Sequence, residues 1–137
     1  MDCIFCKIIS GEIPCSKVYE DDLFIAFLDI KPIRKGHTLI VPKKHFENIF
    51  DTPEAEAQAI YQVTGRVAAA VKEATGASGI NVIQNNGEDS GQEVFHSHLH
   101  IIPRKKDDGL KFERQHEEYN GFEEMGKLAH RIMNLTV

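Results

Sequence analysis

The sequence predicts an α+β domain with a mainly antiparallel sheet of about five strands, one long helix and a C-terminal helix. Short apolar runs flank tight polar turns, and a single long amphipathic segment separates the earlier runs from the later ones. Neighbouring runs without a helix between them favour antiparallel pairing. A chain of 137 residues is the size of one domain with one core.

The first predicted elements are a short helix and a hairpin. Residues 4–10 form the helix, which ends at Gly11 because glycine tolerates the positive φ found just past a helix end. Residues 18–20 and 24–28 carry strand-forming side chains on either side of the acidic pair at 21–22. These two runs are therefore expected to pair across a tight turn.

A third strand and the long helix follow. Residues 38–41 are apolar and mostly β-branched, and Pro42 closes the run. The segment 53–75 has apolar side chains at helical spacing, a proline suited to the first helical turn, and Gly76 at its end. It is expected to be the helix that covers the sheet.

The second half of the chain contains two further predicted strands, at 80–84 and 94–102, separated by the polar loop 85–92. Residues 105–119 are polar enough to form a mobile surface segment. A helix is expected from Phe122 because apolar side chains recur along one stripe after it.

The composition excludes several classes of protein. The 16 basic and 21 acidic side chains give a net charge of −5, so long nucleic acid is not an expected partner. A small phosphorylated ligand remains open, because backbone amides hold phosphate without net positive charge. The chain shows neither an export leader nor about 18 consecutive apolar residues, so we expect a cytoplasmic protein with no membrane partner.

Three histidines stand at alternate positions in the predicted strand: His96, His98 and His100. Side chains two residues apart lie on one face of a strand, so the three imidazoles are expected to share a surface. The opposite face is apolar except for Ser97 and carries Phe95, Leu99 and Ile101. An exposed polar face or an adventitious metal-binding tract is the simpler alternative, but polar residues in an apolar strand need partners or a function.

The chemistry of imidazole suggests a reaction class. A largely neutral ring can act as nucleophile, acid–base group or zinc ligand. Attack of a ring nitrogen on activated phosphorus splits one difficult displacement into two easier steps, which predicts phosphoryl or nucleotidyl transfer. In the preceding loop Gly91 permits close backbone approach, and the amides of Gln92 and Glu93 could face anionic oxygens. A plain hairpin connection is the alternative for this loop.

The cysteines do not suggest a disulfide framework. Cys3 and Cys6 have the spacing of a zinc knuckle, and His45 and His96 are candidates for the two further ligands that a tetrahedral site needs. A redox pair and two buried free thiols are the alternatives. Cys15 has no partner in this pattern and is expected to be a packed thiol.

The motifs together resemble the histidine triad, or HIT, family, whose mark is His-x-His-x-His followed by two apolar residues. The resemblance covers most of residues 3–104, so the whole chain, 1–137, is expected to be one HIT domain with 105–137 as a C-terminal extension. The matching segments are the Ile-Phe pair at 4–5, residues 27–30, 36–45 and 85–103 and, within the last, the triad at 96–102.

The resemblance implies a nucleotide-binding hydrolase or transferase acting on the α-phosphate of a nucleoside monophosphate ester, amide or anhydride. His98 matches the family nucleophile, which forms a covalent nucleotidyl-histidine, and His100 and His37 match the supporting histidines. A purine nucleotide such as AMP or a derivative is the expected ligand. Within this class the alternatives are a Hint-like phosphoramidase and a Fhit-like dinucleoside polyphosphate hydrolase. A zinc-stabilised nucleotide sensor or scaffold with little turnover is the alternative of another class.

The same resemblance implies contacts to the nucleotide. Asp29 would accept from the ribose hydroxyls, although a turn residue before a proline is the simpler interpretation. Asn85 and Gln92 would touch phosphate or ribose. The base would be enclosed by four apolar side chains, for which ordinary core packing is the alternative: Phe5, Phe27, Ile30 and Leu39.

Similarity to zinc-containing family members and to galactose-1-phosphate uridylyltransferases implies that the metal is structural zinc. The family also implies a homodimer, with the long helix and a strand edge as the expected contact surfaces. Glu93 and Ser97 depart from the residues that many relatives carry, which leaves their effect on substrate and packing open.

Overall fold

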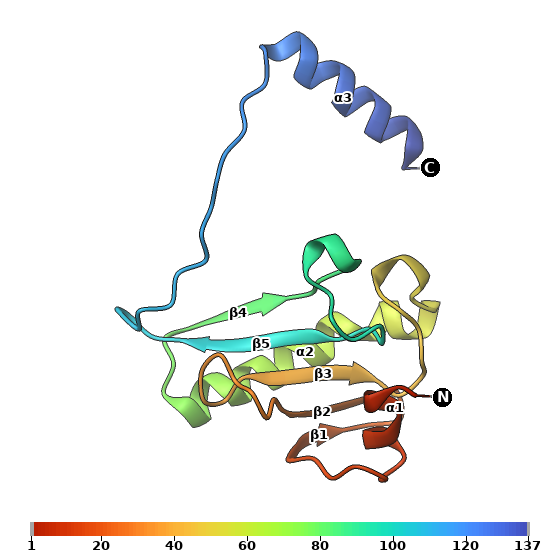
Figure 1. The fold of residues 1–137 in the computed structure, drawn as a ribbon, viewed down its shortest axis with the longest axis vertical. Helices are drawn as coiled ribbons and strands as arrows, with labels where there is room; N and C mark the ends of the chain where they lie inside the picture. The colour runs from red at the N-terminus through yellow and green to blue at the C-terminus, as the bar shows by residue number, and fades with distance from the viewer. Residues whose placement is uncertain (1, 137) are drawn as a thin grey trace.

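The fold was analysed in a computed structural model, which describes residues 2–136, and it contains one five-stranded sheet with strand order β1-β2-β3-β5-β4 (Figure 1). All four strand pairings are antiparallel, which confirms the predicted fold class. The strands are β1 (Lys17–Glu20), β2 (Phe24–Leu28), β3 (Thr38–Pro42), β4 (Gly79–Ile83) and β5 (Leu99–Arg104). The helices are α1 (Ile4–Ile9), α2 (Glu54–Thr75) and α3 (Phe122–Leu135), with single 3-10 turns η1 (Ile49–Asp51) and η2 (Glu88–Ser90).

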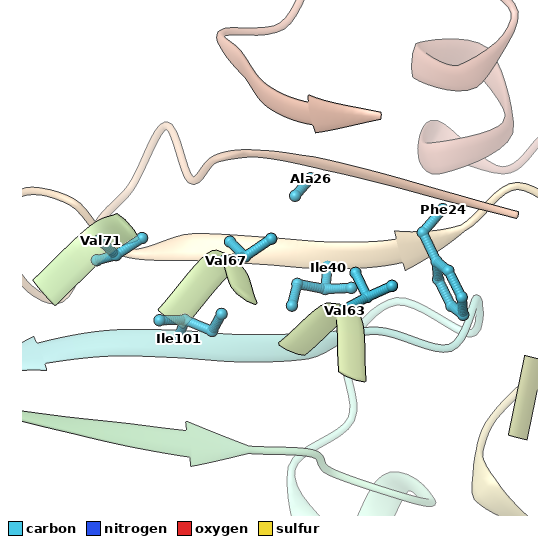
Figure 2. Close-up of a cluster of buried hydrophobic side chains, with 7 residues drawn as sticks. All are labelled: Phe24, Ala26, Ile40, Val63, Val67, Val71 and Ile101. Carbon is cyan, nitrogen blue, oxygen red and sulfur yellow. The ribbon is translucent and has the colours of Figure 1, made fainter. Parts of the chain in front are cut away.

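The sheet buries apolar side chains on both faces, because alternate residues of β2 and β3 point to opposite sides. Helix α2 covers one face, and its valines interdigitate with the sheet (Figure 2). This cluster consists of Phe24, Ala26, Ile40, Val63, Val67, Val71 and Ile101. Helix α1 contributes to the cluster on the other face, which consists of Phe5, Ile25, Phe27, Leu39 and Val41. The histidines described below lie on this second face.

The turn before β3 is packed tightly against the end of α2. Gly36 has φ +98°, and a Cβ at this position would lie 2.5 Å from Thr75 Cγ2, so only glycine fits here. The next residue is His37, whose side chain is 2 % exposed. The close approach of Gly36 to α2 therefore fixes the start of β3 and the position of His37.

The strand predicted at 94–102 is wrong over its first half, because β5 begins at Leu99 and residues 94–98 are irregular. The physical reason lies in a side chain: His96 Nε2 donates to the Pro42 carbonyl at 2.8 Å. The imidazole thus binds the carbonyl that a backbone N–H of a paired strand would otherwise bind at the end of β3. The segment 94–98 is therefore not hydrogen-bonded to β3 as a strand. Two of the three triad histidines are consequently held by loop geometry.

The C-terminal part of the chain stands apart from the sheet. After β5 an extended segment leads to α3, which lies beyond β4 in Figure 1. Every residue from Lys111 to Thr136 is exposed. The helix expected from Phe122 is present as α3, but its apolar stripe packs against no buried cluster of residues 2–136. Within the same described range, no helix combines the length and apolarity needed to cross a membrane.

Candidate functional site

Four sulfur and nitrogen atoms converge beside the first turn of α1. They belong to Cys3, Cys6, His45 and His96, and all lie within 4.8 Å of one another. His96 Nδ1 is 3.4 Å from Cys3 Sγ and 3.6 Å from Cys6 Sγ. His45 Nδ1 is 3.5 Å from Cys6 Sγ and 3.0 Å from His96 Nδ1. The structure therefore brings together the four residues that the sequence offered as metal ligands.

Local structure explains why these atoms meet. Cys3 is the N-cap of α1, and its sulfur accepts from the Cys6 N–H at 3.4 Å, so the two thiols share one side of the first turn. His45 follows the end of β3. His96 donates through Nε2 to the Pro42 carbonyl, which leaves Nδ1 as the lone pair facing the thiols.

The donor set fits zinc. Tetrahedral zinc has Zn–S distances of about 2.3 Å and Zn–N distances of about 2.0–2.1 Å, which place neighbouring ligand atoms roughly 3.3–3.8 Å apart. The distances of 3.0–3.6 Å here require only small shifts to match. Burial and the neighbouring Cys3 thiol raise the pKa of Cys6, which favours the neutral thiol at this sulfur. Four protein donors would fill every position of a tetrahedral ion, as in structural zinc sites.

The second triad histidine has a single available ring nitrogen. His98 is 8 % exposed, and its Nδ1 lies 2.7 Å from the His96 carbonyl oxygen. A carbonyl only accepts, so Nδ1 carries the proton and Nε2 carries the lone pair of the neutral ring. Burial lowers the pKa of His98, which keeps the ring neutral near pH 7. His98 is therefore held in the tautomer that a nucleophile at Nε2 requires.

His100 carries its proton on Nε2, the opposite of His98, because of two hydrogen bonds in series. The Ile33 N–H donates to His37 Nδ1 at 3.1 Å, so the proton of neutral His37 is on Nε2. That proton is donated to His100 Nδ1 at 2.9 Å, which leaves the His100 proton on its own Nε2. Burial is the main cause that lowers the pKa of His37, and it lowers the pKa of His100 to about 4.

The two rings form a complementary pair. His98 and His100 have ring centroids 5.0 Å apart, so a lone pair and an N–H are presented by adjacent imidazoles. The lone pair can attack an electrophile, while the N–H can stabilise negative charge on it. Asp29 Oδ2 lies 3.7 Å from His37 Nε2, and Asp29 Oδ1 accepts from the Lys31 N–H at 2.9 Å. The carboxylate therefore retains acceptor capacity at the edge of this group.

Gln92, in the loop before the triad, was expected to contact phosphate or ribose, but its side chain is hydrogen-bonded to neighbouring backbone groups. Gly91 has φ +100°, as its place in a tight turn requires, and Asn85 Nδ2 donates to its carbonyl at 3.5 Å. Gln92 is 4 % exposed, and its amide hydrogens go to the Glu47 and Val94 carbonyls at 2.7 and 3.0 Å. Its backbone N–H donates to the Gly87 carbonyl. Gln92 is thus fully engaged in holding the loop, whereas Glu93 is exposed.

The four apolar candidates for the base site separate into two groups. Phe5, Phe27 and Leu39 are buried in the cluster under α1, as the core-packing alternative proposed. Phe5 also presents its ring at a steep angle to His98, with centroids 5.0 Å apart. Ile30 is 90 % exposed. Phe5 thus lies between the candidate metal ligands at α1 and the candidate nucleophile, while Ile30 is available to a ligand from the solvent side.

Sequence reasoning missed the polar residues that support the loop. Asn48 accepts from the Phe50 N–H, and Asp51 accepts from the Asn48 N–H at 2.9 Å, which forms a capping box at η1. Asn48 Nδ2 also approaches Gln92 Oε1 at 3.4 Å. The spacing of Asn48 and Asp51 could have indicated the cap. Ser97, noted as a departure, is buried and accepts from Gln84 Nε2 at 3.3 Å.

Comparison with known proteins places this geometry in a family. The family model described as "HIT domain" matches residues 10–107. "Protein hit" of Bacillus subtilis is 49 % identical over 110 residues, covering 80 % of this chain and 76 % of its own. "Adenylylsulfatase HINT3" of Arabidopsis thaliana is 46 % identical over 109 residues, covering 80 % of this chain and 55 % of its own.

Solved structures agree with this placement. A crystal structure titled as a member of the HIT family from Bacillus subtilis has a TM-score of 0.93 at 39 % identity, covering 100 % of this chain and 99 % of its own. A "histidine triad nucleotide-binding protein" from Candida albicans has a TM-score of 0.86 at 37 % identity, with 97 % and 96 % covered. A "ZN-bound histidine triad family protein" from Mycobacterium smegmatis has a TM-score of 0.77 at 36 % identity, with 98 % of both chains covered. The chain is therefore a member of the HIT family.

Proposed function

We propose that this protein is a nucleotide-binding hydrolase that acts on the α-phosphate of nucleoside monophosphate derivatives through a covalent intermediate on His98. The single observation that carries this proposal is the paired tautomers: a lone pair on His98 Nε2 beside an N–H of His100. The names of two relatives, an adenylylsulfatase and a nucleotide-binding protein, support the substrate class. An AMP derivative with a leaving group on phosphorus is the expected ligand.

The reaction proceeds in two displacements. His98 Nε2 attacks the α-phosphorus, a P–N bond forms, and the bond from phosphorus to the leaving group breaks. A leaving amine departs with a proton from solvent. In the second step water attacks phosphorus, the P–N bond breaks, the electron pair returns to His98, and a proton is released to solvent. The N–H of His100 stabilises the charge that develops on the phosphoryl oxygens.

Other residues are assigned positioning or contact roles. His37 orients His100, because its Nε2–H fixes which nitrogen of His100 accepts. Asp29 accepts from the ribose hydroxyls, and Asn85 with the amide of Glu93 lines the phosphate side. Gln92 and Gly91 act through the loop that they hold. The apolar residues Phe5, Phe27 and Leu39 form the floor of the base site, and Ile30 covers it from solvent.

We assign structural zinc to Cys3, Cys6, His45 and His96. When bound, zinc cross-links α1 to the ends of β3 and the triad segment; it supplies no chemistry at phosphorus. The assignment is supported by the convergent donor atoms and by the zinc-bound relative from Mycobacterium smegmatis. The three cysteines are free in the structure, which suits a reducing compartment such as the cytoplasm. The family resemblance adds a homodimer to the proposal.

The proposal is tested by trapping the intermediate. The zinc-loaded protein is mixed rapidly with adenosine phosphoramidate radiolabelled at phosphorus, quenched in alkali, and analysed for protein-bound label. We expect an alkali-stable, acid-labile label that is absent in His98→Asn and retained in His116→Asn, an exposed histidine far along the chain. Turnover without label in any quench would refute the covalent route, and binding of AMP without turnover of any derivative would favour the sensor alternative.

The leaving group is identified by a direct comparison of substrates. Adenosine phosphoramidate, adenylyl sulfate and a diadenosine polyphosphate are supplied separately, and the release of AMP is followed. The adenylylsulfatase name of the Arabidopsis thaliana relative favours turnover of the first two. Preference for the diadenosine compound would instead identify the Fhit-like alternative.

A further inference from the structure

The apolar side of α3 is an exposed hydrophobic feature that the proposed catalytic site does not use. Its large apolar side chains are 40–88 % exposed. They follow helical spacing and form one stripe, named here the α3 stripe: Phe122, Met125, Leu128, Ile132, Met133 and Leu135. A stripe of this length on a helix of 14 residues would not remain in water without a partner.

The arm that carries α3 leaves the sheet in a defined direction. Arg104 donates to both oxygens of Asp108 and, at 2.7 Å, to the Leu110 carbonyl. Arg34 donates to the Asp108 carbonyl at 2.8 Å, and Phe112 lies 5.4 Å from the Arg104 guanidinium. These contacts bind the root of the arm, so its course away from the sheet begins at an anchored point.

Two of the solved relatives place the arm as this chain does, whereas the Mycobacterium smegmatis relative, with a TM-score of 0.77, gives no such agreement. Residues 105–137 make up about a quarter of the chain, so a relative whose arm lay elsewhere would lose a corresponding share of its TM-score. The Bacillus subtilis structure nevertheless reaches 0.93 over the whole chain, and the Candida albicans structure 0.86 over 97 % of it. An apolar helix held away from its own domain at the same position in these two relatives needs a partner that they share, and a second copy of the same chain is such a partner.

A second apolar surface lies toward the β1 edge of the sheet, whereas α3 lies beyond β4 (Figure 1). An apolar groove of about 400 Å³ lies between the C-terminal half of α2 and the start of the sheet. It is lined by Val18, Leu28, Val67, Ala70, Val71 and Ala74. In Figure 1, α3 lies beyond β4, whereas β1 and β2, which contribute to the groove, lie at the other edge. The helix is therefore not positioned to fill the groove of its own chain.

We infer that α3 of each protomer docks with its stripe in the α2 groove of a second copy, so that two arms are exchanged across a symmetric dimer. β4 pairs only with β5 among residues 2–136, and its Val82 is 48 % exposed, which leaves that edge of the sheet open to the second copy. The inference rests on the proposed homodimer and adds the contact that holds it. It does not depend on the reaction assigned to His98.

The test is the association of full-length, zinc-loaded chains by sedimentation velocity. Leu128→Glu/Ile132→Glu alters the stripe, Ala70→Glu alters the groove, and each is expected to weaken dimerisation at least tenfold. Lys127→Glu/Arg131→Glu and Gln62→Glu are matched controls at exposed positions outside the stripe and groove, and these are expected to dimerise as the wild type does. Far-UV circular dichroism and thermal unfolding verify that every variant is folded.

Mixing the stripe variant with the groove variant distinguishes exchange from folding back. A mixed dimer restores one intact pair, the wild-type α3 of one chain in the wild-type groove of the other, so dimers should reappear on mixing. No recovery, with both variants folded, would overturn the exchange. If the stripe variant weakens dimerisation and the groove variant does not, the groove is not the receptor of α3. If the stripe variant dimerises as the wild type does, the inference is overturned while the homodimer remains. A monomeric wild type at all concentrations would refute both.

Discussion

Two neighbouring groups of histidines hold their rings differently, although both draw members from the same motif at residues 96–100. In the group formed by His45 and His96 with the two thiols, the ring lone pairs converge on a single point. In the group formed by His37, His98 and His100, the rings are arranged so that protons and lone pairs alternate. A backbone carbonyl or N–H sets the available nitrogen of His96, His98 and His37. The ring of His37 in turn sets it for His100.

The two groups are also physically linked. The carbonyl of His96 accepts the proton that sets the His98 tautomer, and the ring of the same residue faces the thiols. Phe5 lies against both rings, with centroids 5.8 Å from His96 and 5.0 Å from His98. The structural group is therefore expected to influence catalysis only through position, and substitutions should separate the two groups by their effects on stability and rate.

The largest effect is expected for His98→Asn, which removes the lone pair that attacks phosphorus. Turnover of adenosine phosphoramidate should fall by about 10³-fold or more, because the remaining groups bind substrate without forming the P–N bond. Zinc content and thermal unfolding should remain close to wild type. A residual rate within tenfold of wild type would show that another group is the nucleophile.

The next largest effect is on stability, in Cys3→Ser. Loss of a thiolate ligand should release the zinc and lower the free energy of unfolding by roughly 3 kcal/mol. For a domain of this size that corresponds to a fall in Tm of roughly 10 °C. Cys15→Ser is the control, because this thiol lies outside the group of donor atoms. Equal changes in metal content and Tm for the two variants would contradict the assigned site.

A smaller loss of rate is expected for His37→Phe, which preserves the ring shape but removes the proton donated to His100. The rate should fall about 10- to 100-fold, because His100 then loses its fixed tautomer while His98 is untouched. The split between kcat and KM identifies the role: a positioning residue changes kcat more than KM. A change confined to KM would place His37 in ground-state binding instead.

The smallest expected effect is in the pH dependence of stability. Burial lowers the pKa of His100 to about 4 from an ordinary value near 6.5, so the unfolded chain binds the proton first as pH falls. This residue's contribution is therefore fully present above about pH 6.5 and is lost between that value and about 4. In urea unfolding, the free energy of unfolding of wild type should fall between pH 7.5 and pH 4.5 by about 2 kcal/mol more than that of His100→Phe. Equal pH dependence in the two proteins would contradict a buried neutral ring.

Much of the fold was predictable because the patterns were local. The hairpin of β1 and β2, the helix α2 ending at Gly76, and α3 all follow from side-chain periodicity and turn residues within one segment. The strand over 94–102 was predicted too long, because the interruption comes from the Pro42 carbonyl, a partner distant in sequence. The supporting role of Gln92 was missed for the same reason, since its acceptor on Glu47 lies 45 positions away.

The sequence by itself determined which residues could do chemistry: alternating imidazoles, a pair of thiols spaced for one helical turn, and an apolar stripe on the last helix. Only the tertiary structure decided how they divide the work. It turned His96 toward the thiols, set one proton on His98 and another on His100, and left α3 without a packing partner among residues 2–136. The physical reason is that spacing along a chain selects neighbours, whereas protonation and coordination depend on hydrogen-bond partners that folding brings from elsewhere.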